Sequence, residues 1–185
     1  MIKLSKNIFG IKKRLNDLNN LLSSNVCCFT GYRPQKCPWG FNEKDERFIK
    51  VKEETRRAIK NAISIGYNTF LCGMAIGFDM MCAEIVLELK KNDKNIRLIG
   101  ALPCRNQDEK WNNEHKQRYK SIIKQLDCIR CIYDKYEDGC MKERNKFMIN
   151  NSSLCIALFD GKPGGTKQTI DYAKSLNKEI IYINF

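Results

Sequence analysis

The amino-acid sequence predicts an α/β protein, a Rossmann-like, doubly wound domain with a mostly parallel sheet of about six strands and helices on both faces. Short apolar runs alternate along the chain with longer segments in which apolar residues recur at helical spacing. Parallel neighbours in a sheet need crossover connections, and the helical segments supply them. A chain of 185 residues is long enough to form one such domain with a sizeable core.

The predicted elements follow one another in a regular order from residue 25. The first strand is predicted at residues 25–30, an apolar run that ends at Gly31. The next segment, residues 43–65, has helical spacing and ends before Gly66, a residue type that favours helix C-termini. The same alternation predicts strands at residues 69–72, 96–102, 128–133, 154–159 and 179–183, and helices at residues 78–90, 111–126, 141–150 and 165–176.

The chain is expected to consist of a basic amphipathic N-terminal extension, residues 1–24, and a single domain, residues 25–185. Apolar residues recur in the extension at helical spacing among lysines and asparagines, at Ile8, Ile11, Leu15, Leu18 and Leu22. Two interpretations stay open: a helix packed on the domain, or a contact for a partner or a membrane surface.

The chain is strongly basic, with 33 basic and 21 acidic side chains and a net charge of +12. The basic residues are scattered, and they comprise 23 lysines and 10 arginines among 18 asparagines. This pattern favours a compositional bias over a dedicated nucleic-acid surface, although it remains compatible with anionic ligands and with nucleic acid.

Ten cysteines without a secretory segment predict a cytoplasmic protein. No run approaches the roughly 18 uncharged apolar residues that span a bilayer, so no transmembrane segment is expected. Cys128 and Cys131 form one C-x-x-C pair without a second pair at zinc spacing, and no metal site is therefore predicted.

Unusual residues collect in the loops that follow the predicted strands, at residues 30–34, 73–79, 102–104 and 160–166. Ligands of such sheets bind at the carboxyl ends of the strands, so these loops are expected to open onto one site. Helices that begin near Gly77 and Gly165 would point their positive ends at an anion, and Arg33 could clamp it. The spacing Gly73-x-x-x-Gly77 matches neither G-x-G-x-x-G nor a P-loop, which disfavours an ordinary dehydrogenase or ATPase.

The residues predicted to contact a ligand lie in or beside these loops: Thr30, Gly31, Arg33, Gly73, Met74, Ala75, Gly77, Asp79, Pro103, Gln107, Trp111, Arg144, Asn145, Asp160, Gly161, Gly164, Gly165 and Thr166. Some have a second interpretation. Asp79 either accepts hydrogen bonds from a ribose or caps its helix, and Asp160 is either a ligand contact or a turn residue. Trp111 either stacks on a base or anchors the next helix to the sheet.

The motifs at residues 30–34, 73–79, 144–145 and 164–166 resemble those of the SLOG superfamily, in particular its YpsA-like or YoqJ-like branch. The resemblance covers about residues 25–185. This superfamily includes the DNA-processing protein DprA and the Lonely Guy phosphoribohydrolases. The resemblance implies a Rossmann-like fold that binds nucleotides or nucleotide-derived ligands, and it is compatible with a homodimer.

The phosphoribohydrolases carry Met-x-x-Arg-Lys followed by Pro-Gly-Gly-x-Gly-Thr-x-x-Glu, and their arginine and glutamate act at the N-glycosidic bond. The resemblance assigns the arginine position, and hence the candidate catalytic role, to Arg144. The second element departs from the pattern. Thr169 stands at the glutamate position if Thr166 is matched to the motif threonine, and Asp171 stands there in an ungapped match. Since threonine cannot replace a carboxylate at a glycosidic bond, hydrolysis by that mechanism is doubtful.

These observations lead to three hypotheses about function. The first is a cytoplasmic sensor or regulatory protein that binds a nucleotide or nucleotide derivative, with no certain cofactor beyond that ligand. The second is an N-glycosidic-bond hydrolase of the phosphoribohydrolase type, and the third is a DprA-like module that binds single-stranded DNA. Whether the protein is an enzyme stays open at this point.

Overall fold

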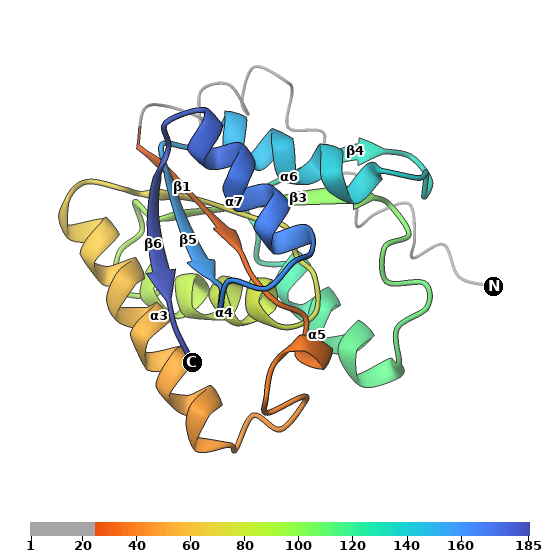
Figure 1. Ribbon diagram of the computed structural model, residues 1–185, viewed down its shortest axis with the longest axis horizontal. Coiled ribbons are helices and arrows are strands. Elements are labelled where there is room, and N and C mark those ends of the chain that lie inside the picture. Colours follow the sequence, from red (N-terminus) through yellow and green to blue (C-terminus); the bar gives the residue numbers. More distant parts are fainter. Residues whose placement is uncertain (1–24) are drawn as a thin grey trace.

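The computed structural model describes residues 25–185, so the predicted extension at residues 1–24 lies outside the described residues. The described part forms one six-stranded sheet in which every pair of neighbouring strands is parallel, in the order β4-β3-β2-β1-β5-β6 (Figure 1). The strands are β1 (Val26–Thr30), β2 (Thr69–Cys72), β3 (Arg97–Cys104), β4 (Cys128–Tyr133), β5 (Leu154–Leu158) and β6 (Glu179–Ile183). The helices are α3 (Glu46–Ser64), α4 (Phe78–Lys90), α5 (Asn113–Ile123), α6 (Cys140–Asn150) and α7 (Gly165–Ser175), with a short 3-10 helix η1 (Pro34–Lys36) after β1.

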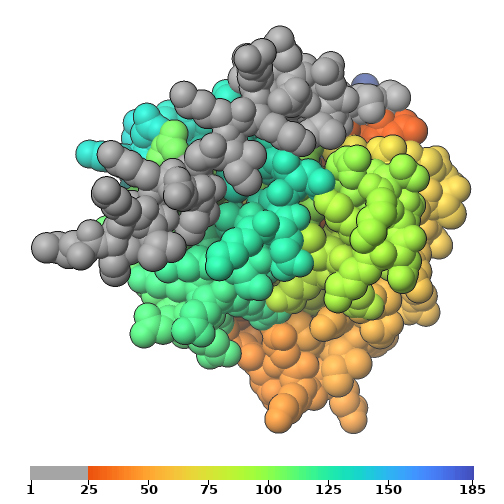
Figure 2. Space-filling model, turned by 180° about the vertical axis from the view of Figure 1, so that it is seen from behind, coloured from red at the N-terminus to blue at the C-terminus, as the bar shows by residue number. Residues whose placement is uncertain are grey.

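The helices cover the sheet on both faces. Helices α3, α4 and α5 pack side by side on one face, where Figure 2 shows α4 in yellow-green between the yellow α3 and the green α5. Helices α6 and α7 pack on the opposite face, nearer the viewer in Figure 1. The predicted Rossmann-like, doubly wound fold is thereby confirmed.

The central strand β1 is apolar throughout because it is buried from both sides. Successive side chains of a strand point to opposite faces. Cys27 and Phe29 accordingly belong to the core under α3 and α4, whereas Val26 and Cys28 belong to the core under α6 and α7. Continuous apolar runs of this kind are typical of parallel strands covered on both faces.

Several element boundaries differ from the prediction by one to three residues, and α5 (Asn113–Ile123) is shorter at both ends than the predicted 111–126. Two of the differences have identifiable reasons. Helix α3 begins at Glu46, later than predicted, because the Asp45 side chain caps it by accepting a hydrogen bond from the Arg47 N–H at 2.9 Å. Strand β3 was predicted to end at residue 102 but continues to Cys104, since its pairing with β4 extends to Tyr133. Pro103 therefore lies inside a buried strand and not in a loop.

The strand order places a topological switch point between β1 and β5. From β1 the chain passes to β2, β3 and β4 in turn, and α6 then carries it back to β5 on the other side of β1. The loops that leave the carboxyl ends of β1 and β5 thus diverge to opposite faces. A crevice at this point is where open α/β sheets bind ligands.

Among residues 25–185, no helix combines the length and apolar character needed to cross a membrane.

Candidate functional site

A cavity of about 350 Å³, here called the crevice cavity, lies at this switch point. Its walls come from the end of β1 and the following loop, from the loop after β2, from α6 and from the start of α7. Residues predicted from the sequence to contact a ligand contribute much of the lining, namely Thr30, Gly31, Arg33, Ala75, Asp79, Arg144, Asn145, Gly165 and Thr166. Segments distant in the sequence therefore meet at one site.

Arg144 and Asp79 form a buried charge pair in this lining. Only 5% of Arg144 and 7% of Asp79 is exposed, and 3.7 Å separates Nη1 of Arg144 from Oδ2 of Asp79. Arg144 also donates hydrogen bonds from Nη1 to the Gly73 carbonyl and from Nε to Oδ1 of Asn145, the latter at 2.8 Å. The Ala75 N–H donates to Oδ2 of Asp79 at 3.2 Å. The side chains of α6 and α4 are thus held together beneath the cavity.

Burial acts on the pKa of both partners. Desolvation raises the pKa of Asp79 above its usual range, and the Arg144 charge opposes this shift. Desolvation likewise lowers the pKa of Arg144, and the Asp79 carboxylate opposes that shift. Each charge therefore depends on the other, and the loss of either would leave an uncompensated charge in the interior.

Glycine is required at position 73 because the side chains of Arg144 and Asp79 lie against its backbone. A Cβ atom at position 73 would lie 2.0 Å from Nη1 of Arg144 and 2.7 Å from Oδ2 of Asp79. The glycine therefore makes room for the guanidinium group, and no larger residue fits there without moving it.

The N-terminus of α7 offers backbone donors to the cavity. Helix α7 begins at Gly165, and no side chain in the described part of the chain caps it at Gly164. The first N–H groups of a helix lack partners within the helix and carry its positive end, so this corner suits an anion. Gly165 and Thr166 both line the cavity.

At the start of α4, unlike the start of α7, the first backbone N–H groups have partners in neighbouring loops within residues 25–185. Its Phe78 N–H donates to the Tyr32 carbonyl at 3.4 Å, and its Met80 N–H donates to the Ala75 carbonyl at 3.3 Å. Gly77, with φ of 101°, lines a neighbouring cavity. The α4 amides thus tie loops together, whereas the first two residues of α7, Gly165 and Thr166, line the crevice cavity.

Two cations stand in the loop after β1. Arg33 and Lys36 are both exposed and both line the crevice cavity. Lys36 lies over the turn before α7, because its Nζ atom is 2.6 Å from the position that a Cβ of Gly164 would occupy. Arg33 and Lys36 consequently make the opening of the crevice cavity positively charged beside the loop after β1.

Asp160 connects the two loops that diverge at the switch point. The Tyr32 hydroxyl donates to Oδ1 of Asp160 at 2.5 Å, and Nζ of Lys162 lies 2.7 Å from Oδ2 of Asp160. The bonds from Lys162 and Tyr32 lower the pKa of Asp160 to about 2. Burial and the bond to Asp160 raise the pKa of Tyr32 to about 12.

Helix α7 contributes no carboxylate to the lining. Thr169 is buried, donates to the Gly165 carbonyl at 2.9 Å and accepts a hydrogen bond from Nδ2 of Asn145 at 2.8 Å. Asp171 is exposed and pairs with Lys167 at 2.6 Å. Asp79 is the one carboxylate among the described residues that line the crevice cavity.

The other predicted contacts lie outside this lining. Met74 is fully buried, and Gln107 donates from Nε2 to the Met74 carbonyl at 3.3 Å. Trp111 packs edge-on against Tyr119 with 5.3 Å between ring centroids. The remaining residues of this group are Gly73, Gly77, Pro103, Asp160, Gly161 and Gly164.

Gln35 and Lys36 also line the crevice cavity, although they were not among the residues predicted to contact a ligand. They continue the loop after β1 beyond Pro34, so the length of that loop was the available signal.

The chain matches the family model YpsA, described as the YspA SLOG family, over residues 27–185. A UPF0398 protein of Brevibacillus brevis is 30% identical over 128 residues, which cover 68% of this chain and 68% of that protein. The SPbeta prophage-derived protein YoqJ of Bacillus subtilis is 30% identical over 144 residues, which cover 71% of this chain and 84% of that protein.

Two solved structures share the fold. DNA processing protein A (DprA) from Streptococcus pneumoniae has a TM-score of 0.62 at 14% identity and matches 88% of this chain, which spans about half of that protein (51%). DprA from Helicobacter pylori has a TM-score of 0.60 at 18% identity over 88% of this chain and 67% of that protein. The family model covers nearly all of the described domain, and the resemblance inferred from the sequence motifs is confirmed: the chain belongs to the YpsA family of SLOG proteins.

Proposed function

We propose that this protein binds a nucleotide or nucleotide-derived ligand in the crevice cavity, with a phosphate of the ligand against the start of α7. The observation that carries the proposal is the arrangement of positive groups. Arg144 lies buried in the lining, Arg33 and Lys36 stand exposed in the loop after β1, and uncapped N–H groups begin α7. Phosphate groups are well matched by guanidinium groups and helix N-termini.

The size of the cavity supports a small ligand. Its volume of about 350 Å³ is near the lower end of the roughly 300–1,000 Å³ that ligand pockets occupy. A phosphate with its sugar fits this range better than an extended dinucleotide.

The proposal is tested by thermal unfolding of the full chain with inorganic phosphate, ribose 5-phosphate, mononucleotides, cyclic nucleotides and ADP-ribose. A ligand at about 100 times its Kd adds about 2.7 kcal/mol to the free energy of unfolding, so the Tm should rise by several degrees. The variant Gly165→Leu should keep the Tm of the free protein but lose the rise, because space is open around position 165. An unchanged rise in this variant would contradict the proposed site.

Two matched double variants distinguish the contribution of the proposed site to the Kd from that of the overall charge. Replacing Arg33 and Lys36 together by alanine should raise the Kd for ribose 5-phosphate at least tenfold. Replacing Lys50 and Lys60, which are exposed on α3, removes the same charge and should leave the Kd unchanged. Equal effects of the two double variants would show that binding depends on net charge alone.

Single-stranded DNA is a second candidate ligand. DprA of Helicobacter pylori, whose structure describes a single-stranded DNA binding mode, shares the fold, and this chain carries a net charge of +12. Retention of single-stranded oligonucleotides on filters at low salt, with loss in the Arg33→Ala, Lys36→Ala variant, would support this function. The absence of retention would eliminate it.

A further inference from the structure

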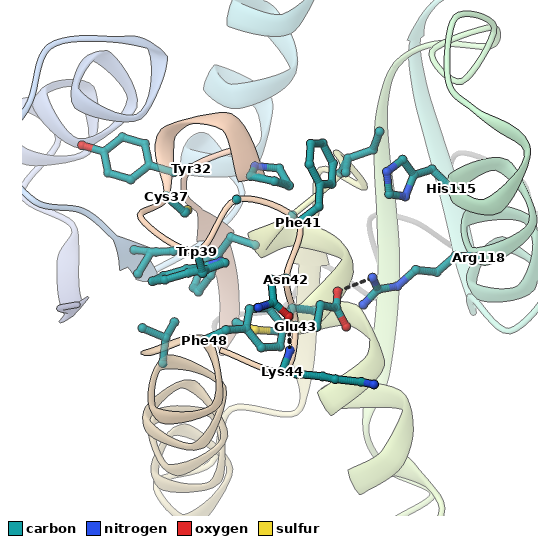
Figure 3. A pocket seen from close by; sticks show the side chains of 18 of the residues that line it. Tyr32, Cys37, Trp39, Phe41, Asn42, Glu43, Lys44, Phe48, His115 and Arg118 are labelled. Atoms are coloured by element: carbon teal, nitrogen blue, oxygen red, sulfur yellow. Dashed lines mark hydrogen bonds and ion pairs between the residues drawn. The ribbon is translucent and has the colours of Figure 1, made fainter. Parts of the chain in front are cut away.

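A second cavity, larger than the first, adjoins the crevice cavity. Its volume is about 630 Å³, and it lies between the loop from Pro34 to Lys44, the start of α4 and the first turns of α5 (Figure 3). It is here called the aromatic cavity. Nothing in the proposed phosphate contact uses it.

The inner walls of the aromatic cavity are buried aromatic rings. Trp39 and Phe48 are each 8% exposed and meet edge to face, with 6.1 Å between ring centroids. Phe78 lines the same space from the start of α4. Trp39 is also fixed from behind by Phe185, at 5.2 Å between centroids. These contacts hold flat apolar surfaces in place before any ligand arrives.

At the rim of the aromatic cavity, the loop after β1 contacts α5 at two points. Phe41 stacks on His115 with 5.3 Å between centroids and an angle of 25° between the rings. Glu43 pairs with Arg118 at 2.5 Å, and both contacts cross between the two elements in Figure 3. Phe41 is nevertheless 53% exposed. The loop thus presents a large aromatic ring to solvent beside the cavity instead of burying it in the core.

Lys44 is an exposed cation in the lining of the aromatic cavity, but the other charged groups of its rim do not suit a phosphate. The Arg118 guanidinium is already bound by the carboxylates of Glu43 and Glu84, the latter at 2.6 Å. Glu43 and Glu114 line the cavity and would repel an anion. Asn42 and Asn112 add amide groups whose Oδ1 atoms accept from the N–H groups of Lys44 and His115 and whose Nδ2 groups can donate. Flat apolar walls with such an edge match an uncharged heteroaromatic ring.

The two cavities share part of their walls. Tyr32 and Ile76 line both, and Pro34 and Gly77, from the same two loops, line the aromatic cavity. A ligand that lies across these residues would place an anionic group in the crevice cavity and a ring in the aromatic cavity. A nucleotide has both groups, joined by a sugar.

We propose that the aromatic cavity binds the nucleobase of the ligand whose phosphate occupies the crevice cavity. This inference rests on the proposed function, because the phosphate contact fixes which end of the ligand lies where. Phe41 is the residue assigned to contact the base from the rim.

The two tryptophans of the sequence, Trp39 and Trp111, allow a direct readout. Trp39 lines the aromatic cavity and Trp111 does not. In a Trp111→Phe background, AMP should quench the remaining fluorescence, whereas ribose 5-phosphate should bind without quenching and should displace AMP. Dinucleotides and short single-stranded DNA, run in parallel, distinguish a free nucleotide from a polymer as the source of the base.

The variant Phe41→Ala should raise the Kd for AMP about tenfold, which corresponds to about 1.4 kcal/mol, because the stacking of the base on the ring is lost. It should leave the Kd for ribose 5-phosphate unchanged. Tyr136→Ala is the matched control, since Tyr136 is a 60% exposed aromatic residue that does not line the aromatic cavity. This control should change neither Kd.

Three results would overturn the inference. Equal weakening of AMP and ribose 5-phosphate by Phe41→Ala would mean that the ring acts on the loop and not on the base. AMP binding without quenching and with an unchanged Kd in Phe41→Ala would place the base elsewhere while leaving the proposed function intact. Failure of phosphate, ribose 5-phosphate and AMP to bind at all would overturn the proposed function and this inference together.

Discussion

At the scale of single residues, the proposed site contains an arginine, Arg144, that is buried in the free protein. Arg144 is held by Asp79, Asn145 and the Gly73 carbonyl, so its position is fixed by the protein itself. A guanidinium group positioned in this way loses little conformational entropy when an anion approaches. Asp79 balances its charge in the free protein.

The variant Asp79→Asn should lower the free energy of unfolding by about 3 kcal/mol, because removing one partner of a buried pair leaves the other charge uncompensated. Denaturant titration measures this difference. Asp171→Asn, on the exposed side of α7, is the control and should stay within about 0.5 kcal/mol of the parent protein. Equal stability of the two variants would show that the buried pair contributes nothing.

Asp160 should make stability depend on pH in acid. Its pKa is lowered from 3.8 to about 2 by Lys162 and Tyr32, so the folded protein favours the ionised form. The stabilisation is therefore fully present above the unfolded value of 3.8 and is lost as the pH falls toward 2. The stability difference between the parent and Asp160→Asn should shrink over this interval. A constant difference from pH 5 to pH 2 would contradict the assigned pKa.

At the scale of elements, Gly73 in the turn after β2 and Gly165 at the start of α7 have different surroundings. The Cβ position of Gly73 is filled by Arg144 and Asp79, whereas that of Gly165 is open. Gly73→Ala should therefore lower the free energy of unfolding by about 1–3 kcal/mol through overpacking. Gly165→Ala should change it little, and thermal unfolding of the two variants provides the comparison. A stable Gly73→Ala protein would mean that the guanidinium can move aside.

Local sequence signals were sufficient to predict most elements and the loops that line the crevice cavity. Gly-rich turns after apolar runs placed Gly31, Asp79 and Gly165 at one edge of the sheet, and these residues line the crevice cavity. Other assignments needed contacts between distant segments. The Gly73 carbonyl accepts a hydrogen bond from Arg144, which lies 71 residues later in the chain, and this contact was not predicted. No local pattern records such a pairing.

At the scale of the whole molecule, alternating strands and helices were enough to predict the fold class, but not the strand order. Spacing along the chain is the same whether β5 pairs with β1 or with β4, so the switch point and the cavity beside it emerge only in three dimensions. The same limit applies to the aromatic cavity. Its walls come from the loop after β1, α4 and α5, whose aromatic residues look like ordinary core residues in the sequence.

The net charge of +12 should be visible in the salt dependence of binding. Each phosphate contact contributes about 0.7 log units of affinity per tenfold change in salt for a single strand. A mononucleotide with one bound phosphate should therefore show a shallow slope, and an oligonucleotide that contacts several lysines should show a steep one. Binding titrations at several salt concentrations measure both slopes. A steep slope for a mononucleotide would indicate general attraction to the surface instead of a defined site.

The position of β5 beside β1 also has a consequence for the order in which the protein can form. One edge of β1 pairs with β2 early in the chain, but within residues 25–185 its other edge pairs with Leu154–Leu158. During synthesis, the apolar segment Val26–Thr30 therefore remains an open edge strand until most of the chain has left the ribosome. A nascent chain that stalls before β5 would have an unpaired strand edge that can pair with another chain, and it would lack the crevice cavity. The protein should therefore gain its ligand site and its protection from aggregation in the same late step.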